Sequence, residues 1–399
     1  MNRRLGSLVV KNFRQLRDLS IPELGHVNLI VGGNNSGKST LLDALRLLAG
    51  KAAPSLIEEL LTSHGELQNT TQDTVADAVP ERAISNLFFG RKFPSNDAEK
   101  IVVGDIHLKQ FASLEHIYLR EEFETREIDG ESSTVRRLRR LNKEDPGDLT
   151  NAIEAVEIIS SDRPDLFGSM PRTSRIPLTD MFGPRRGLVR SRLEESIVGM
   201  PCSYVSSRFN TQNSLAEAWD AVVLTDGEDL ALDALRIIEP HTLGLAFVQN
   251  SRPRVARSPS MRAIDERIAV LKVEGHEAPV PLQSMGDGMA RLLQLVLSAL
   301  RAGDGFLLVD EIENGLHFSV QERLWDVLFA LSARYGMQVF ATTHSNDCVR
   351  AFSEVSLRYT QLDGKLLHMD RIEENGEAVV SVMSERSLSN LISSSVEVR

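Results

Sequence analysis

One short segment near the N-terminus constrains this chain more than any other. Leu29–Val31 is apolar and runs into a loop of the pattern G-x-x-x-x-G-K-S, from Gly32 to Ser39. The apolar run predicts a buried strand, and the leucines spaced after Ser39 predict a helix. Glycines let successive backbone N–H groups curl around a phosphate chain, and the start of a helix favours an anion. The sequence therefore supplies the strand–loop–helix context that a phosphate-binding loop requires.

The residues of this loop predict an ATP and Mg²⁺ site. Lys38 brings a compact positive charge to the β- and γ-phosphates, and the Ser39 hydroxyl is suited to ligate Mg²⁺. The alternative is an ordinary glycine turn between a strand and a helix. It does not explain why a lysine and paired glycines occur at these positions. The expected nucleotide-binding residues are Gly32, Gly33, Asn34, Asn35, Ser36, Gly37, Lys38, Ser39 and Thr40.

A second apolar run ends in two carboxylates. Phe306–Val309 is followed directly by Asp310 and Glu311. A buried strand of an α/β sheet delivers such acids to the edge where the phosphate loop lies. Asp310 is suited to hold Mg²⁺, and Glu311 to polarise the water that attacks the γ-phosphate. A solvated acid pair is the alternative, and beside a phosphate loop we favour the hydrolytic roles.

Two further segments predict contacts with phosphate. The turn containing Ser284 and Gly286 precedes a helical pattern, so it offers a hydroxyl, small residues and a helix N-terminus. A plain helix N-cap formed by Ser284 is the alternative. His344 follows an apolar strand and is expected to reach the γ-phosphate, as a catalytic residue beside Glu311 and Lys38. The remaining histidines lack metal-ligand spacing and are expected to be structural.

Composition limits the class of protein. The 399 residues include 42% hydrophobic and 25% charged residues, as in soluble globular proteins. No apolar run approaches the ~20 residues that span a bilayer, and the N-terminus lacks a signal-peptide pattern. The two cysteines, Cys202 and Cys348, exclude a disulfide framework and a cysteine-rich zinc site. We expect a cytoplasmic protein without membrane contact.

Charge leaves contact with DNA open. The net charge of −11 argues against a uniformly basic nucleic-acid surface, although a local groove stays compatible with it. Each local cluster is more typical of a solvated face or an ion-pair surface than of a DNA site. The clusters are Arg136–Arg140; Arg185, Arg186, Arg190 and Arg192; and Arg252, Arg254 and Arg257.

The order of segments predicts an α/β fold, a P-loop ATPase head with a mostly parallel sheet, antiparallel N-terminal strands and an inserted α+β or helical region. We expect an N-terminal half of the core at 1–51, an insertion at 52–240, a C-terminal half at 241–355, and a hairpin and tail at 356–399. Prolines punctuate the insertion and forbid a long helix. Short strands are expected near 84–89, 101–107 and 115–119. We also expect a helical stretch at 213–238 with a break near Asp226-Gly227, and a final hairpin of Leu357–Gln361 with Lys365–Met369.

The order of these motifs is similar to that of ABC-type ATPases. The strings GGNNSGKSTLLDAL, SMGDGMARLL, LLVDEIENGLH and QVFATTHS resemble the OLD (overcoming lysogenization defect) nuclease group and its relatives in bacterial anti-phage systems. RecF-like and SMC-like proteins are more distant. The resemblance covers residues 5–50 and 280–350. It implies a head-to-head dimer in which the Ser284 turn closes on nucleotide at the partner's Lys38 loop, with Asn314 and His317 crossing the interface. It also implies a glutamine after the first lobe, for which no candidate stands out.

Two departures from the family pattern shape the interpretation. The segment after His344 is shorter than the ~100 residues of a usual domain and lacks the Asp-x-Asp pair of a Toprim nuclease. The insertion shows no heptads of an SMC coiled coil. We therefore expect an ATPase subunit without nuclease activity: a homodimer or larger homo-oligomer that acts as sensor or scaffold in a defence system such as PARIS or Septu. Its partners would be a separate nuclease effector chain and a phage-derived trigger. A RecF-like DNA-repair ATPase and a degenerate, nucleotide-gated scaffold are the alternatives.

Overall fold

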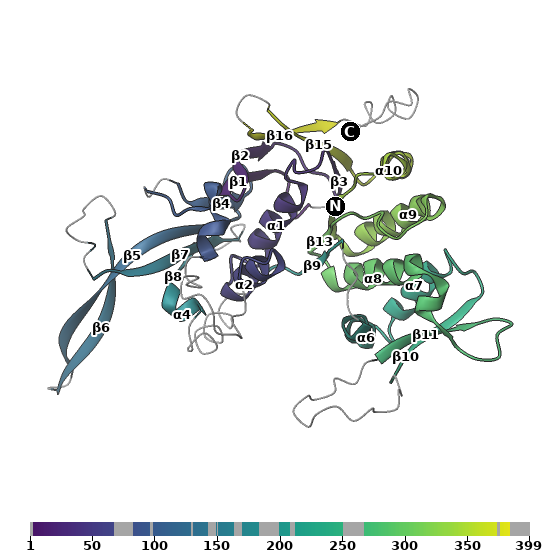
Figure 1. The fold of residues 1–399 in the computed structure, drawn as a ribbon, viewed down its shortest axis with the longest axis horizontal. Helices are drawn as coiled ribbons and strands as arrows, with labels where there is room; N and C mark the ends of the chain where they lie inside the picture. Colours follow the sequence, from purple (N-terminus) through teal and green to yellow (C-terminus); the bar gives the residue numbers. More distant parts are fainter. Residues whose placement is uncertain are drawn as a thin grey trace.

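The computed structural model describes residues 3–67, 83–95, 99–128, 131–142, 149, 151–162, 170–182, 199–207, 212–249, 267–372 and 376–383. The arginine clusters at 185–192 and 252–257 lie outside these ranges, as does the side chain of Arg136. Figure 1 shows an elongated molecule, with a β-rich arm at one end, a group of helices at the other and α1 between them.

The central sheet has six strands in the order β16-β15-β3-β14-β13-β9. Apart from the antiparallel β16, every strand lies parallel to its neighbour. Every residue of β3, β13 and β14 is buried, as expected for parallel strands that are covered on both faces. The strands are β3 (Val27–Val31), β9 (Cys202–Val205), β13 (Phe306–Val309), β14 (Gln338–Thr342), β15 (Gly364–Arg371) and β16 (Ala378–Met383).

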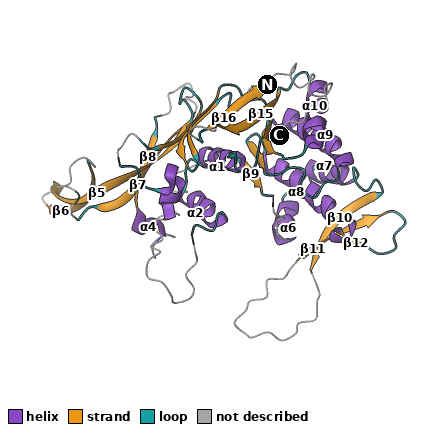
Figure 2. Ribbon diagram, turned by 45° about the horizontal axis from the view of Figure 1, so that its top comes forward, coloured by secondary structure: helices purple, strands orange, loops and turns teal. Residues whose placement is uncertain are grey.

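Helices cover the two faces of this sheet, and alternate strand residues enter separate cores. Leu29 and Leu307 belong to the core formed with α8, α9 and α10, whereas Ile30 and Leu308 belong to the core formed with α1 and α2. Figure 2 shows α1 and α2 apart from α8, α9 and α10. The helices are α1 (Lys38–Ala49), α2 (Pro54–Ser63), α8 (Asp287–Ala302), α9 (Phe318–Tyr335) and α10 (Asn346–Arg358).

The arm is a seven-stranded antiparallel sheet of order β2-β1-β4-β5-β7-β8, with β6 paired to β5. The long β5–β6 hairpin projects from the body in Figure 1. Short helical elements pack beside this sheet: η1 (Ile84–Leu87), η2 (Phe89–Arg91) and α4 (Leu178–Phe182). The strands are β1 (Leu8–Phe13), β2 (Leu16–Ile21), β4 (Ile101–Gly104), β5 (Phe111–Ile128), β6 (Glu131–Leu141), β7 (Ile153–Ser161) and β8 (Arg172–Pro177).

A small third sheet of order β10-β11-β12 lies at the helical end of the molecule. The elements there are α6 (Gln212–Asp220), α7 (Asp226–Leu235), β10 (Thr242–Gln249), β11 (Arg267–Val273), β12 (Val280–Pro281) and η4 (Leu282–Met285). No described helix has the length and the apolar character needed to cross a membrane.

The expected α/β class, with a mostly parallel sheet and antiparallel N-terminal strands, is confirmed by these sheets. The expected break in the helical stretch 213–238 is present, since α6 ends at Asp220 and α7 begins at Asp226. Two other local predictions are wrong. The segment 84–89 forms 3₁₀ turns rather than a strand. Residues up to Arg358 complete α10, so the final hairpin is β15 with β16.

The prediction of the C-terminal hairpin is wrong because Asp363-Gly364, considered in isolation, is typical of a tight turn. In the structure Gly364 instead starts β15, which pairs in parallel with β3. A Cβ at Gly364 would lie 2.0 Å from the Ser356 hydroxyl oxygen, so this position requires glycine for a close approach. The proposed boundary at 355 therefore divides one sheet, because β15 belongs to the core.

Candidate functional site

The ends of four parallel strands meet at one edge of the central sheet. β3 leads into the phosphate loop, β13 into Asp310, and β14 into His344. The fourth strand, β9, lies beside β13 and leads into Ser206 and Ser207. Parallel register brings all four carboxyl ends to the same place, so the topology assembles the residues singled out in the sequence.

The phosphate loop has the conformation of an anion cradle. Gly32 and Gly37 have φ of 146° and 109°, which favour glycine. A Cβ at Gly32 would lie 2.0 Å from the Met369 carbonyl oxygen, so β15 also excludes a side chain there. α1 starts at Lys38 with no capping side chain and no acid in its first turn. Its first N–H groups are therefore available to an anion.

Two buried polar groups of the loop fit a phosphate ligand. Ser36 Oγ is buried and has no hydrogen-bond partner among the described residues. Lys38 Nζ donates 2.8 Å hydrogen bonds to the carbonyl oxygens of Gly32 and Gly33. Burial lowers the pKa of Lys38, while the nearby carboxylates of Asp310, Glu311 and Glu313 oppose that shift. The ammonium is thus held inside the loop at the place where phosphate oxygens would bind.

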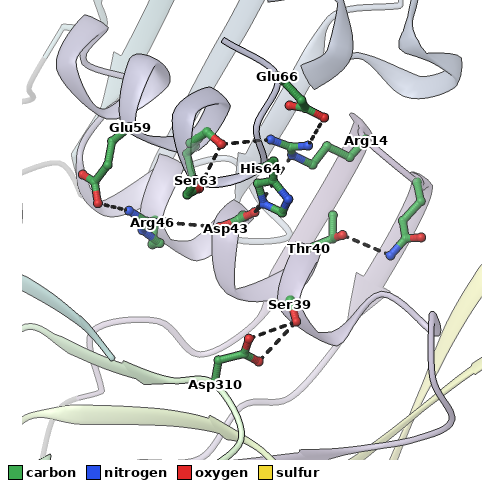
Figure 3. Close-up of polar contacts among 12 residues, drawn as sticks. Arg14, Ser39, Thr40, Asp43, Arg46, Glu59, Ser63, His64, Glu66 and Asp310 are labelled. Atoms are coloured by element: carbon green, nitrogen blue, oxygen red, sulfur yellow. Dashed lines mark hydrogen bonds and ion pairs between the residues drawn. The ribbon is translucent and has the colours of Figure 1, made fainter. Parts of the chain in front are cut away.

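Ser39 and Asp310 form the candidate Mg²⁺ site (Figure 3). Ser39 Oγ lies 3.2 Å from each carboxylate oxygen of Asp310, and the Thr342 hydroxyl donates a 2.7 Å hydrogen bond to Asp310 Oδ1. These hard oxygen donors suit Mg²⁺, which usually takes one or two protein ligands and completes its shell with phosphate and water. No cluster of three or more acidic, histidine or cysteine side chains that could hold a metal occurs in the described ranges.

Glu311 has a strained backbone. Its φ is 49°, in the left-handed region that non-glycine residues rarely adopt. Its N–H donates to the Thr342 hydroxyl at 2.8 Å, and the next N–H, of Ile312, donates to the Thr342 carbonyl at 3.0 Å. Such outliers persist where surrounding contacts impose them, and they cluster at functional sites.

His344 lies across a cavity from the phosphate loop. The cavity has a volume of about 270 Å³ and is lined by Val31, Gly32, Gly33, Asn34, Thr343, His344, Ser345 and Val349. The imidazole is exposed, and the backbone N–H of His344 donates to Glu313 Oε1 at 2.8 Å. The structure therefore brings together Lys38, Ser39, Asp310 and the His344 loop.

Arg291 is a site residue that sequence reasoning missed. Arg291 lies on α8 and is only 1% exposed. One of its guanidinium nitrogens donates a 2.7 Å hydrogen bond to the Ser206 carbonyl oxygen. The other donates to the carbonyls of Asp310 and Glu311 at 3.0 and 3.1 Å. Burial lowers the pKa of Arg291, and the nearby acids oppose the shift. In the sequence, an arginine between apolar helix positions is typical of a residue that faces solvent. The hydrogen bonds of Arg291 to the backbone of the site could therefore be found only in the structure.

The turn of Ser284 and Gly286 stands apart from the phosphate loop of its own chain. Within the described ranges, no hydrogen bond or ion pair joins the two. Gly286, with φ of 93°, is the N-cap of α8, and Ser284 is exposed in η4. The interpretation of Ser284 as a plain helix N-cap is therefore wrong. Two residues that the family resemblance placed at the dimer interface, Asn314 and His317, are also exposed.

The helix that carries the phosphate loop is anchored by a buried polar network (Figure 3). Asp43 on α1 is buried and contacts His64 Nε2 at 2.8 Å and Arg46 at 3.3 Å. Arg14 lies beside it and bonds Glu66 at 2.9 Å. These contacts tie α1 to α2 and to the β1–β2 turn, so they fix the direction in which α1 presents its N-terminus.

The basic cluster on the arm is neutralised by acids. Arg140 forms ion pairs with Glu115 and, at 2.6 Å, with Glu157. Arg139 pairs with Glu122 at 3.2 Å. The described part of this cluster is therefore not an unpaired positive surface for nucleic acid.

Comparisons with known proteins support an ATPase. The family model described as "AAA domain, putative AbiEii toxin, Type IV TA system" matches residues 27–347. An ATP/GTP phosphatase of Helicobacter pylori is 24% identical over 367 residues, covering 88% of this chain and 87% of its own. The OLD nuclease of Thermus scotoductus is 50% identical over 52 residues, which is 13% of this chain and 10% of the nuclease.

Solved structures of SMC heads also align with the chain. The SMC head bound to the C-terminal winged-helix domain of ScpA covers 96% of this chain and 98% of its own, with 14% identity and a TM-score of 0.46. The SMC head domain from Thermotoga maritima covers 96% and 99%, with 14% identity and a TM-score of 0.42.

The fold and the site define a P-loop ATPase. More particularly, the chain belongs to the family of AAA domains whose description names a putative AbiEii toxin of a type IV toxin–antitoxin system.

Proposed function

We propose that this ATPase hydrolyses ATP with Mg²⁺ at the edge of the central sheet, through the residues just described. The observation that carries the proposal is the 3.2 Å approach of Ser39 Oγ to both Asp310 oxygens, beside the buried Lys38. Mg²⁺ would neutralise phosphate charge at Ser39 and Asp310. Lys38 and the N-terminus of α1 bind the phosphates, and Glu311 orients water. His344 contacts the γ-phosphate from the opposite wall.

We further propose that the complete site forms between two copies of the chain. Ser284 and Gly286 are exposed and face no phosphate in their own chain, so they suit a nucleotide that is held by a partner copy. Exposed groups at the start of α9 support a contact there: Phe318 is 58% exposed, and its ring lies tilted against that of His317 with 4.2 Å between the ring centroids. Asn314 and His317 would lie in the same interface. Nucleotide binding would then close the dimer, and hydrolysis would open it.

We propose a role in bacterial anti-phage defence, as the sensor or scaffold of a two-component system such as PARIS or Septu. The similarity to a segment of an OLD nuclease and the toxin named in the family description support this context. Among the described residues, the candidate metal ligands that we identify lie at the ATP site. We therefore propose that a separate effector chain cleaves nucleic acid. We expect this assembly to work in the cytoplasm and to respond to a phage-derived trigger.

Co-expression with the chains encoded next to it tests this role. The purified chain should hydrolyse ATP yet leave plasmid DNA and tRNA intact with Mg²⁺ or Mn²⁺. Cleavage should appear only with a second chain, and plaque formation should fall only when both are present. Cleavage by this chain alone that survives Asp310→Ala would contradict the two-component proposal. Salt-sensitive stimulation of its ATPase by DNA, without a partner nuclease, would favour the RecF-like alternative.

A further inference from the structure

The loop that carries His344 depends on one side chain for which the sequence predicts no role. β14 ends at Thr342, so its ladder hydrogen bonds to β3 and β13 stop before His344. The backbone N–H of His344 instead donates a 2.8 Å hydrogen bond to Glu313 Oε1. A hydrogen bond to an ionised carboxylate is stronger and shorter than one between neutral groups. Glu313 therefore fixes the main chain at the base of the exposed imidazole.

Glu313 is itself held by the turn that follows β13. The Asn314 N–H donates to the Glu311 carbonyl at 3.0 Å, and the Leu316 N–H donates to the Glu313 carbonyl at 2.9 Å. This turn begins at Glu311, with its positive φ. Glu311 and the acceptor of the His344 N–H thus lie two residues apart in the same hydrogen-bonded turn.

The second carboxylate oxygen points to a role beyond simple packing. Glu313 Oε2 is buried and has no hydrogen-bond partner among the described residues. Buried polar atoms are rarely left unpaired in native structures, and an exception calls for an explanation. The charge of Glu313 also lies within electrostatic range of Lys38 and Arg291, the two buried cations of the site. Glu313 therefore bonds the main chain of one group of the ATP site, His344, and its charge acts on two more, Lys38 and Arg291.

We propose that Glu313 is a positioning residue that holds His344 against the γ-phosphate and links its loop to the turn that carries Glu311. This inference rests on the proposed hydrolysis at the site. Glu313 touches no reacting atom and acts through the main chain of His344. Loss of the acceptor should release the loop, lower the rate of hydrolysis, and leave the phosphate loop able to bind nucleotide.

The test is a double-mutant cycle in the full chain, measured by ATP turnover. Glu313→Ala should lower kcat about 10- to 100-fold, because small displacements of catalytic groups cost that much, with KM for ATP changing less than about threefold. Glu313→Gln retains an oxygen acceptor and should restore kcat to within about threefold of wild type. His344→Ala should lower kcat, and adding Glu313→Ala to it should cause no further loss, since coupled residues are not additive.

Asp347→Asn is the matched control. This carboxylate lies in the first turn of α10, is 55% exposed, and bonds Arg350 at 3.3 Å instead of the His344 loop. The substitution Asp347→Asn removes one negative charge close to the His344 loop, as Glu313→Ala does, and should leave kcat unchanged. Thermal unfolding and binding of a fluorescent ATP analogue report whether each variant is folded.

Three results would overturn the inference. In the first, the loss of kcat in the double variant equals the product of the losses caused by Glu313→Ala and His344→Ala alone, which means that the two residues act independently. Glu313→Gln could be folded and as slow as Glu313→Ala, or Glu313→Ala could turn over ATP at the wild-type rate. A chain that hydrolyses ATP with this pattern but gives no phage protection would remove the defence role and leave the role of Glu313 intact.

Discussion

The Thr342 hydroxyl accepts the N–H of Glu311 at 2.8 Å, across the gap between two parallel strands. The same hydroxyl donates to Asp310 Oδ1 at 2.7 Å. One fully buried side chain on β14 thus orients both acids that follow β13. Because a hydroxyl can donate and accept at once, threonine meets both demands, and an apolar residue of the same shape meets neither.

Thr342→Val should therefore slow catalysis while the chain still folds. It leaves the Glu311 N–H without its partner, which costs about 1–3 kcal/mol of stability, and it frees the Asp310 carboxylate to turn. We expect kcat to fall roughly 10- to 100-fold, as for other small displacements of catalytic groups. Thr342→Ser retains the hydroxyl and is the control. Equal turnover by the two variants would show that this hydroxyl does not orient the acids.

The sequence predicts the parts of this site that are local in the chain. The phosphate loop, the Asp310–Glu311 pair and the histidine after β14 each combine an apolar run with a polar end, so their places on strands can be predicted. The strand order then brings these ends together. Their catalytic and binding roles stay predictions, to be tested by the variants described here.

The contacts that the sequence did not predict connect distant elements. Arg291 donates hydrogen bonds to, and Glu313 accepts one from, backbone groups that lie 19 or more residues away in the chain, and no spacing rule identifies such pairs. The place of β9 beside β13 could not be predicted either, because the strand spans only Cys202–Val205 and follows a proline-rich region. Its register identifies Ser206 and Ser207 as neighbours of the site.

Glu311→Gln and Lys38→Ala should separate hydrolysis from binding. Glutamine preserves the shape of Glu311 but cannot polarise water as a carboxylate does, so turnover should fall by about 10²–10⁴-fold while ATP still binds. Lys38→Ala removes the cation inside the phosphate loop, so ATP binding should be lost. Equilibrium binding of an ATP analogue and phosphate release measure the two effects. Wild-type turnover in Glu311→Gln would mean that another group orients the water.

Mixing two inactive variants should reveal a site shared between subunits. A Ser284→Arg chain and a Lys38→Ala chain are each expected to be inactive. In a mixed dimer one site carries both changes and the other carries none, so part of the ATPase activity should return. Subunit exchange is verified with differently tagged chains. A verified mixed dimer that stays inactive would argue against action of Ser284 across the interface.

Stability at alkaline pH should depend on Cys348. This residue is 1% exposed on α10, and burial, with a smaller effect from Glu313, raises the pKa of its thiol to about 12. The unfolded chain releases this proton near pH 9, whereas the folded chain retains it. The stabilisation is thus fully present below pH 9 and is lost as pH rises from 9 towards 12.

Cys348→Ala removes the pH-dependent contribution of this thiol to the free energy of unfolding and leaves every other titrating group in place. The difference in the free energy of unfolding between wild type and Cys348→Ala should therefore shrink by about 1 kcal/mol between pH 8 and pH 10. Urea denaturation of both chains at the two pH values measures it. The variant should also be less stable than wild type at pH 8, because the truncated side chain leaves a small cavity beneath α10. If the two chains instead lose stability in parallel as the pH rises, the Cys348 thiol titrates at its ordinary value and is not shielded in the folded protein.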